Sequence, residues 1–246
     1  MNIRKIIPNK LKLIINVLRG KYKYNQDGLA SRHNCDFMKD EHFMYCYNSA
    51  VAKGLHVDDK IHWRVHVACW AALHAKNMDA DFVECGVNKG FISKIIMDYI
   101  RFNEKQNKFY LLDTYEGLSE KYVTVGEKEK GIMNYKYLPC YDLVKEVFQN
   151  YENAIIIKGT VPDTLKEVKS NKIGYLYIDM NCIIPELEAL EYFWPRMIKG
   201  GIILFDDYGW SLHIDQKMAF DKFAKEKGVE ILSLPTGQGM MIKPWD

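Results

Sequence analysis

The chain has 246 residues, of which 48% are hydrophobic and 27% are charged. This length fits one α/β domain with an extension better than two full domains, and the composition excludes a chain that is disordered throughout. The net charge of +2 is uneven, because residues 1–23 carry seven basic side chains and no acidic one. The rest carries 27 basic against 32 acidic groups, a net charge of −5, which argues against a nucleic-acid-binding groove.

The N-terminus predicts a short basic helix. Its apolar side chains follow the i, i+3, i+4, i+7 spacing of an amphipathic helix over residues 9–19: Leu11, Ile14, Ile15 and Leu18. Pro8 and Lys10 interrupt any signal-peptide core, and no stretch is long enough to span a bilayer. The apolar stripe either packs on the body or on a second subunit, or it lies on an anionic membrane surface.

Six cysteines are scattered along the chain without a Cys-x-x-Cys pair. Such a pattern predicts free thiols in a reducing cytoplasm rather than a disulfide framework or a zinc site. We therefore expect a cytoplasmic protein. We also expect a homo-oligomer, and the alternative for the N-terminal helix is peripheral membrane contact.

Two helices are expected near residues 40–53 and 59–76, and from residue 80 short apolar runs alternate with helical stretches. The strands are predicted at residues 81–85, 108–113, 153–158, 174–179, 201–206, 229–233 and 239–243. The later helices are predicted at residues 89–102, 141–151, 162–169, 185–198 and 214–227. This alternation indicates a parallel sheet covered on both faces, and the closing hairpin predicts an antiparallel last strand.

The connection over residues 114–140 is long for a compact domain, which is typical of functional or disordered segments. We expect its charged tip, residues 127–130, to be a solvated surface. Its tyrosines are candidates for stacking on a sugar ring, with ordinary loop packing as the alternative: Tyr115, Tyr122, Tyr135 and Tyr137.

Glycines and an acid predict a nucleoside-cofactor site at the carboxyl ends of the first two strands. The first strand ends at Gly86 and the next helix begins near Gly90, so a ligand can approach the backbone there. The second strand ends at Asp113, whose carboxylate can accept hydrogen bonds from both ribose hydroxyls. These features do not separate S-adenosylmethionine from NAD, although the missing third glycine argues against NAD. The alternative is a tight turn beside a surface aspartate.

Three aspartates follow the fourth and fifth strands, namely Asp179, Asp206 and Asp207. Neighbouring parallel strands would bring them to one edge of the sheet, where they repel one another unless a cation or protons neutralise them. Oxygen ligands favour a hard cation such as Mg²⁺, Mn²⁺ or Ca²⁺. In the alternative interpretation, Asp207 caps a turn and Asp179 binds the amino group of the cofactor.

Six ordered motifs resemble those of macrocin O-methyltransferase-like enzymes over about residues 60–244. The motifs are Asp81-Phe-Val-Glu-Cys-Gly-Val-Asn-Lys-Gly90, Leu112-Asp-Thr-Tyr-Glu-Gly-Leu118, Lys158-Gly-Thr-Val-Pro-Asp-Thr-Leu165, Tyr177-Ile-Asp179, Gly200-Gly-Ile-Ile-Leu-Phe-Asp-Asp-Tyr-Gly209 and Leu234-Pro-Thr-Gly-Gln-Gly239. The resemblance implies a Rossmann-like class I methyltransferase fold with a mostly parallel seven-stranded sheet. We therefore expect residues 59–246 to form this domain. Residues 1–58, which the resemblance hardly covers, are expected to form a basic helix and a helical cap.

The resemblance also implies the chemistry: transfer of a methyl group from S-adenosylmethionine to a sugar hydroxyl, with Mg²⁺ or Mn²⁺ held by Asp179, Asp206 and Asp207. The sugar belongs to a glycan or a glycosylated small molecule, and no nucleic acid is expected as a partner. The implied cofactor-binding residues are Glu84, Gly86, Val87, Asn88, Lys89, Gly90, Asp113, Thr114, Gly159, Thr160 and Asp179.

The chain departs from the family pattern at Asn181, where many members carry an aspartate assigned as general base. An asparagine cannot take a proton at neutral pH. Either His213 or Asp207 takes the proton, or Asn181 orients the acceptor, or the chain binds cofactor with little turnover. The candidate catalytic residues are Asp179, Asn181, Asp207 and His213. Two other functions stay open, namely a nicotinamide-dependent oxidoreductase and a low-activity cofactor-binding partner of a glycan-biosynthesis enzyme.

Overall fold

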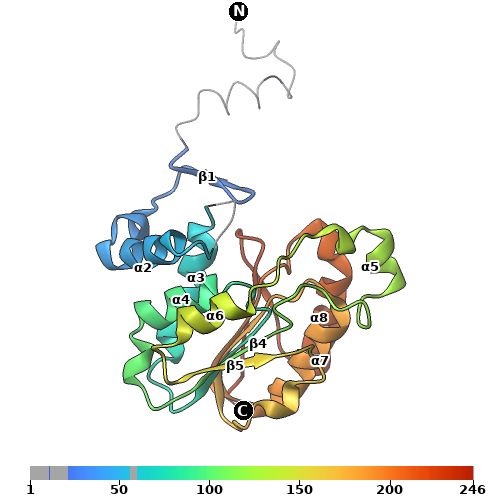
Figure 1. The fold of residues 1–246 in the computed structure, drawn as a ribbon. Coiled ribbons are helices and arrows are strands. Elements are labelled where there is room, and N and C mark those ends of the chain that lie inside the picture. Colours follow the sequence, from blue (N-terminus) through green and yellow to red (C-terminus); the bar gives the residue numbers. More distant parts are fainter. Residues whose placement is uncertain (1–10, 12–21, 56–59, 246) are drawn as a thin grey trace, which may run out of the picture.

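A computed structural model describes Leu11 and residues 22–55 and 60–245, and shows a seven-stranded sheet between two layers of helices (Figure 1). The strand order is β5-β4-β3-β6-β7-β9-β8. The strands are β3 Asp81–Cys85, β4 Phe109–Asp113, β5 Ala154–Lys158, β6 Ile173–Ile178, β7 Met197–Phe205, β8 Leu232–Ser233 and β9 Gly239–Ile242. Strands β3 to β7 pair in parallel and β9 pairs antiparallel with β7. These features confirm the predicted Rossmann-like fold and its antiparallel last strand.

The order of the strands reverses beside β3, which pairs with β4 on one edge and with β6 on the other. In open α/β sheets, ligands bind at the carboxyl ends of the strands next to such a reversal. We therefore expect a ligand site at the segments that follow β3, β4, β6 and β7.

The strands alternate their side chains between two cores, as the period of two requires. Phe82 and Tyr175 belong to one core, whereas their neighbours Val83 and Leu176 belong to the other. Helices α3, α4 and α6 cover the first face, and α7 and α8 cover the second (Figure 1). Their bounds are α3 His62–Ala75, α4 Phe91–Tyr99, α6 Tyr141–Phe148, α7 Ile183–Phe193 and α8 Ile214–Glu226.

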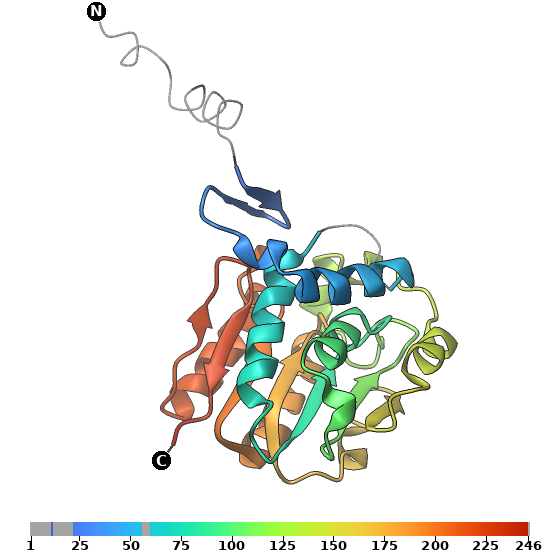
Figure 2. The ribbon, with the colours of Figure 1, turned by 90° about the vertical axis from the view of Figure 1, so that its left-hand side faces the viewer.

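The N-terminal part adds a small hairpin and helix α2, which spans Glu41–Ala52. Strands β1 (Tyr24–Gln26) and β2 (Leu29–Ser31) form the hairpin, which the sequence did not predict. Figure 2 shows α2 crossing the end of α3, and buried residues of α2 such as Phe43 share the core with α4. The predicted helix over residues 9–19 lies outside the described residues except for Leu11. The division at residue 58 stays a prediction.

One expectation about a single segment is wrong, and another is confirmed only in part. The predicted helix over residues 162–169 is a short 3₁₀ turn, Leu165–Glu167, because hydrogen bonds between residues three apart replace the α-helical pattern. The connection over residues 114–140 contains helix α5, Val125–Glu129, and a 3₁₀ turn at Ile132–Asn134. In the expected solvated tip, Lys128, Glu129 and Lys130 are exposed, whereas Glu127 is buried.

The six cysteines are all free and buried, which agrees with the expected reduced thiols. Within the described residues, the helices are too short or too polar for any of them to cross a membrane. The homo-oligomer and the membrane contact stay predictions.

Candidate active site

The turn after β3 brings the backbone close to the end of β6. Gly86 has a φ of +94°, and a Cβ atom there would lie 1.7 Å from the carbonyl oxygen of Asp179, so a side chain does not fit. Asn88 and Gly90 also have left-handed backbone conformations, with φ values of +48° and +81°. Gly90 is the N-cap of α4, so the turn leads directly into the amide-rich start of a helix. This geometry suits a polar ligand group that lies against the backbone.

The carboxylate of Asp113, at the end of β4, is held against this turn. Its Oδ2 atom accepts a hydrogen bond from the backbone N–H of Asn88 at 2.8 Å, and its Oδ1 accepts one from the N–H of Tyr115 at 2.5 Å. Burial raises the pKa of Asp113, whereas these backbone hydrogen bonds oppose the shift. A fixed carboxylate has lone pairs left for two ribose hydroxyls, as the sequence-based prediction requires.

A hollow of about 800 Å³, which includes space open to solvent, lies between this turn, the ends of β4 to β6 and the 114–140 connection. Seven predicted cofactor residues line it: Gly86, Asn88, Asp113, Thr114, Gly159, Thr160 and Asp179. Four others do not line it: Glu84, Val87, Lys89 and Gly90. Glu84 is buried within β3, and this burial raises the pKa of its carboxyl group to about 8. The cofactor role of all eleven stays a prediction.

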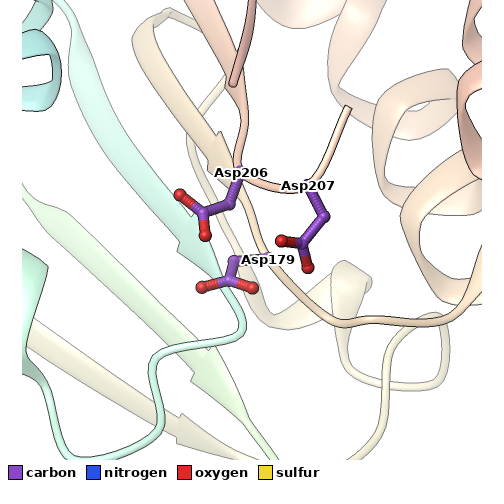
Figure 3. Close-up of side chains that lie close together, drawn as sticks. All are labelled: Asp179, Asp206 and Asp207. Carbon is purple, nitrogen blue, oxygen red and sulfur yellow. The ribbon is translucent and has the colours of Figure 1, made fainter. Parts of the chain in front are cut away.

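The three predicted acids meet beside this hollow. One carboxylate oxygen from each of Asp179, Asp206 and Asp207 lies within 4.8 Å of the others, and Figure 3 shows the three groups converging from neighbouring chain segments. The parallel pairing of Ile178 with Phe205 places the ends of β6 and β7 side by side. Burial, reinforced by the neighbouring carboxylates, raises the pKa of Asp179 and Asp207. The three carboxylates therefore resist being ionised together unless a positive charge lies beside them.

Arg64, which the sequence-based analysis missed, reaches this cluster from α3. Its Nη1 atom donates to Oδ2 of Asp206 and lies 3.9 Å from Oδ1 of Asp207. Its Nη2 and Nε atoms donate to Asp27 at 2.9 and 3.2 Å, so the guanidinium bridges the β1–β2 turn and the acids. Arg64 is only 9% exposed. One feature of the sequence could have indicated that Arg64 points inward. It stands four residues before Ala68, which belongs to the apolar face of the predicted helix.

Asp206 is also held from its other side. The hydroxyl of Tyr177 donates to its Oδ1 atom, and Nε2 of Gln238 donates to the same oxygen at 3.3 Å. Both partners are buried. The orientation of this carboxylate therefore does not depend on Arg64 alone.

Asn181 and His213 lie on opposite sides of the cluster. The side-chain amide of Asn181 donates to Oδ1 of Asp179 at 3.3 Å, and Asn181 lines the hollow. His213 is buried, its Nδ1 atom pairs with Oε1 of Gln216, and its Nε2 lies 3.7 Å from Oδ2 of Asp207. Burial lowers the pKa of His213, so the neutral imidazole is favoured. Since Nδ1 must donate to the amide oxygen, Nε2 presents a lone pair toward the acids.

The 114–140 connection forms an ordered cover over the hollow. Glu127 accepts hydrogen bonds from the backbone of Thr124 at 2.8 Å and from that of Ile183, at the start of α7, at 2.7 Å. The Thr124-x-x-Glu127 spacing is a capping box that was legible in the sequence. Lys130 pairs with Asp215 at the start of α8. The cover is thus fastened to both helices beside the acids.

The four tyrosines of this cover behave differently. Tyr115 is buried and donates to the carbonyl of Leu111 at 3.0 Å, which is ordinary core packing. Tyr115, Tyr122 and Tyr137 all line the hollow. The hydroxyl of Tyr135 lies 3.4 Å from Nε2 of His213. Tyr135 and Tyr137 thus bring aromatic groups toward the acidic end of the site.

Comparison with known proteins relates this arrangement to methyltransferases. A family model described as macrocin-O-methyltransferase (TylF) matches residues 63–232. A curated relative from Streptomyces olivaceus is 24% identical over 153 residues and is described as 8-demethyl-8-(2,3-dimethoxy-alpha-L-rhamnosyl)-tetracenomycin-C 4'-O-methyltransferase. The alignment covers 57% of this chain and 57% of the relative, so the chain spans little more than half of the relative's length.

Solved structures show the same fold at low sequence identity. The O-methyltransferase NovP superimposes with a TM-score of 0.66 at 18% identity, over 74% of this chain and 79% of NovP. The calicheamicin methyltransferase CalS11 gives a TM-score of 0.54 at 14% identity, over 94% and 90%. PaMTH1 of Podospora anserina, solved with S-adenosylhomocysteine (SAH) bound, gives 0.54 at 13% identity, over 98% and 97%.

Proposed function

The chain belongs to the macrocin O-methyltransferase family, and from this premise we propose that it transfers the methyl group of S-adenosylmethionine to a sugar hydroxyl. The observation that supports this proposal most strongly is the position of the acidic cluster at the wall of the hollow: Asp179 belongs to both. A nucleoside cofactor bound against Asp113 would then place its reactive end toward the three carboxylates. The description of the curated relative names a rhamnosyl tetracenomycin as its substrate, and a sugar acceptor is proposed here by analogy.

The cofactor half of the site supplies position rather than chemistry. We expect Asp113 to accept hydrogen bonds from the ribose hydroxyls, and the turn from Gly86 to Asn88 to hold the amino-acid end of the cofactor against its backbone. Tyr122 and Tyr137 close the hollow from the cover. Because methyl transfer is an in-line displacement, holding the two reacting atoms in line supplies much of the rate.

The acidic cluster fits a divalent cation. Its donors are carboxylate oxygens, which Mg²⁺ and Mn²⁺ prefer, and the single guanidinium of Arg64 does not balance the charge of three carboxylates. Asp179, Asp206 and Asp207 would hold the ion. A bound divalent cation would lower the pKa of an acceptor hydroxyl and strengthen it as a nucleophile.

His213 is the group that we propose as the general base. Burial lowers its pKa and so favours the neutral form, Gln216 positions it, and its Nε2 atom faces Asp207 and Tyr135. In this assignment Nε2 of His213 would accept the hydroxyl proton of the sugar while the new O–CH₃ bond forms and the S–CH₃ bond of the sulfonium breaks, with S-adenosylhomocysteine as the leaving group. Asn181, which donates to Asp179, orients that carboxylate and the acceptor instead of taking a proton.

Two other functions were left open by the sequence, namely a cofactor-binding partner and a nicotinamide-dependent oxidoreductase. A cofactor-binding partner with little turnover was suggested by the absence of an acid at position 181, and under the present proposal His213, 3.7 Å from Asp207, serves as the base instead. The family model argues against a nicotinamide-dependent oxidoreductase. Neither alternative is favoured by an observation in the described part of the chain.

Calorimetry with SAH tests the proposed cofactor. We expect micromolar binding by the wild-type protein and about 100-fold weaker binding by Asp113→Ala, since hydrogen bonds to a charged group are lost. Asp142→Ala, which removes an exposed carboxylate in α6, is the matched control and should bind normally. Transfer of a labelled methyl group to a panel of nucleotide sugars and glycosides would then identify the acceptor. A folded protein that binds NADH and not SAH would refute the proposal.

A further inference from the structure

Arg64 places a permanent positive charge inside a cluster that otherwise suits a metal ion. Its guanidinium contacts Asp206 and lies 3.9 Å from Asp207. The side chain is buried, and the ring of Trp210 covers it, with the ring centroid 5.6 Å from the Cζ atom. A guanidinium is not deprotonated in proteins, and burial leaves little water to screen its charge. Any cation that binds the three acids therefore has to bind against this charge.

Asp27 offsets part of that effect from the other side. It lies in the turn of the β1–β2 hairpin with a φ of +50°, and its two carboxylate oxygens accept hydrogen bonds from Nη2 and Nε of Arg64. Gly28, the next residue, packs at the edge of the Trp210 ring, where a Cβ atom would lie 3.4 Å away. The hairpin turn therefore contacts both Arg64 and the Trp210 ring that packs on it.

The charged groups that meet here are the carboxylates of Asp27, Asp179, Asp206 and Asp207 and the guanidinium of Arg64. Four carboxylates and one guanidinium give a formal charge of −3, which becomes −4 when Arg64 is removed and −2 when Asp27 is removed. The field that attracts a divalent ion should change in opposite directions in these two cases. Because Tyr177 and Gln238 also hold Asp206, the loss of Arg64 leaves this ligand oriented.

We propose that Arg64 is a built-in counter-charge that weakens the divalent-cation site, and that its salt bridge to Asp27 makes the strength of this site depend on the docked β1–β2 hairpin. This inference rests on the metal part of the proposed function. Arg64 acts through its charge on a ligand carboxylate and does not touch the reacting atoms. The N-terminal hairpin, far from the acids in sequence, becomes part of the active site.

Titration with Mn²⁺ alone, followed by the electron paramagnetic resonance signal of the free ion, tests this inference on the full-length protein. We expect Arg64→Met to bind Mn²⁺ about tenfold more tightly than wild type, and Asp27→Asn to bind it about fivefold more weakly. Arg64→Lys, which keeps the charge, should stay within about threefold of wild type. Opposite shifts are the signature, because a residue that only supports the local structure would weaken binding in both variants.

Lys94→Met is the matched control, since Lys94 is a buried cation that pairs with Asp98 and Tyr151 away from the acids. Its Mn²⁺ affinity should equal that of wild type. Weaker or unchanged Mn²⁺ binding by Arg64→Met would overturn the inference, as would the absence of Mn²⁺ binding in every variant. SAH binding, measured on the same samples, reports on the cofactor part of the proposed function, and thermal unfolding of these samples confirms that each variant is folded. If SAH fails to bind while the opposite Mn²⁺ shifts are seen, the proposed cofactor fails and the inference stands.

Discussion

The two halves of the site are built in different ways. The cofactor half comes from consecutive segments: the turn after β3, the end of β4 and the loop after β5 each contribute lining residues within short motifs. The acidic half gathers Asp27, Arg64, Asp206 and His213, which lie up to 186 positions apart in the sequence. The first half is set by local backbone geometry, whereas the second depends on how the hairpin, α3 and the cover pack together.

This contrast predicts that a substitution in the acidic half lowers methyl transfer without weakening cofactor binding by the other half. The largest effect is expected for Asp206→Asn, which removes a charge from the acidic cluster and keeps the shape of the side chain. Methyl transfer should fall about 1,000-fold, and SAH affinity should stay within about twofold of wild type. Asp79→Asn, at an exposed aspartate, is the control. Loss of SAH binding in Asp206→Asn would show that the halves are not separable.

His213→Gln tests the proposed base. A glutamine keeps a hydrogen-bonding group but cannot accept a proton, so kcat should fall about 100-fold with little change in KM. The wild-type rate should decline as the pH falls through the pKa of His213, which burial places below 6.5, because protonation removes the lone pair of Nε2. This acidic limb should disappear from the pH profile of the variant. An unchanged limb, compared with the exposed-site control His33→Gln, would assign the proton transfer to another group.

The attachment of the cover is tested by Glu127→Gln. An amide can accept only part of the hydrogen bonds that the carboxylate accepts from Thr124 and Ile183, so the free energy of unfolding should drop by about 1–2 kcal/mol. The KM for S-adenosylmethionine should rise about fivefold, and limited proteolysis should cut more rapidly within residues 119–135. Glu129→Gln in the same helix but at an exposed position should change neither property. Equal behaviour of the two variants would contradict the role given to Glu127.

The smallest effect is expected for Asn181→Asp. If His213 takes the proton, a second carboxylate beside Asp179 adds no base that the site lacks, and kcat should change less than about threefold. Asn171→Asp, in an exposed loop, provides the comparison. A gain of 100-fold or more would show that the natural protein is missing its base and would favour the binding-partner interpretation.

The difference between the halves also explains what could be predicted from the sequence. The fold followed from alternating strands and helices, and the convergence of Asp179, Asp206 and Asp207 followed because adjacent parallel strands end at one edge of the sheet. The position of Asp113 followed from the end of β4 in the same way. Each of these predictions needs only the period of a strand and the order of the strands.

Other features needed information that local patterns do not contain. Nothing near Arg64 in sequence indicates that its guanidinium reaches Asp206, because that contact joins residues 142 positions apart. The hairpin turn at Asp27 was hidden in a polar stretch, although Asp-Gly is a common hairpin turn. The burial of Glu127 was missed because its charged neighbours suggested a solvated tip, while its capping box with Thr124 indicated a helix start.

The most direct test of the whole account is a crystal structure with SAH and Mn²⁺, in which anomalous scattering locates the metal. We predict one Mn²⁺ ion with oxygen ligands from Asp179, Asp206 and Asp207, and an SAH molecule whose ribose contacts Asp113 and whose sulfur points toward the ion. A metal bound elsewhere, or SAH seated away from the turn at Gly86, would contradict the claim that these carboxylates and this hollow form one methyl-transfer site.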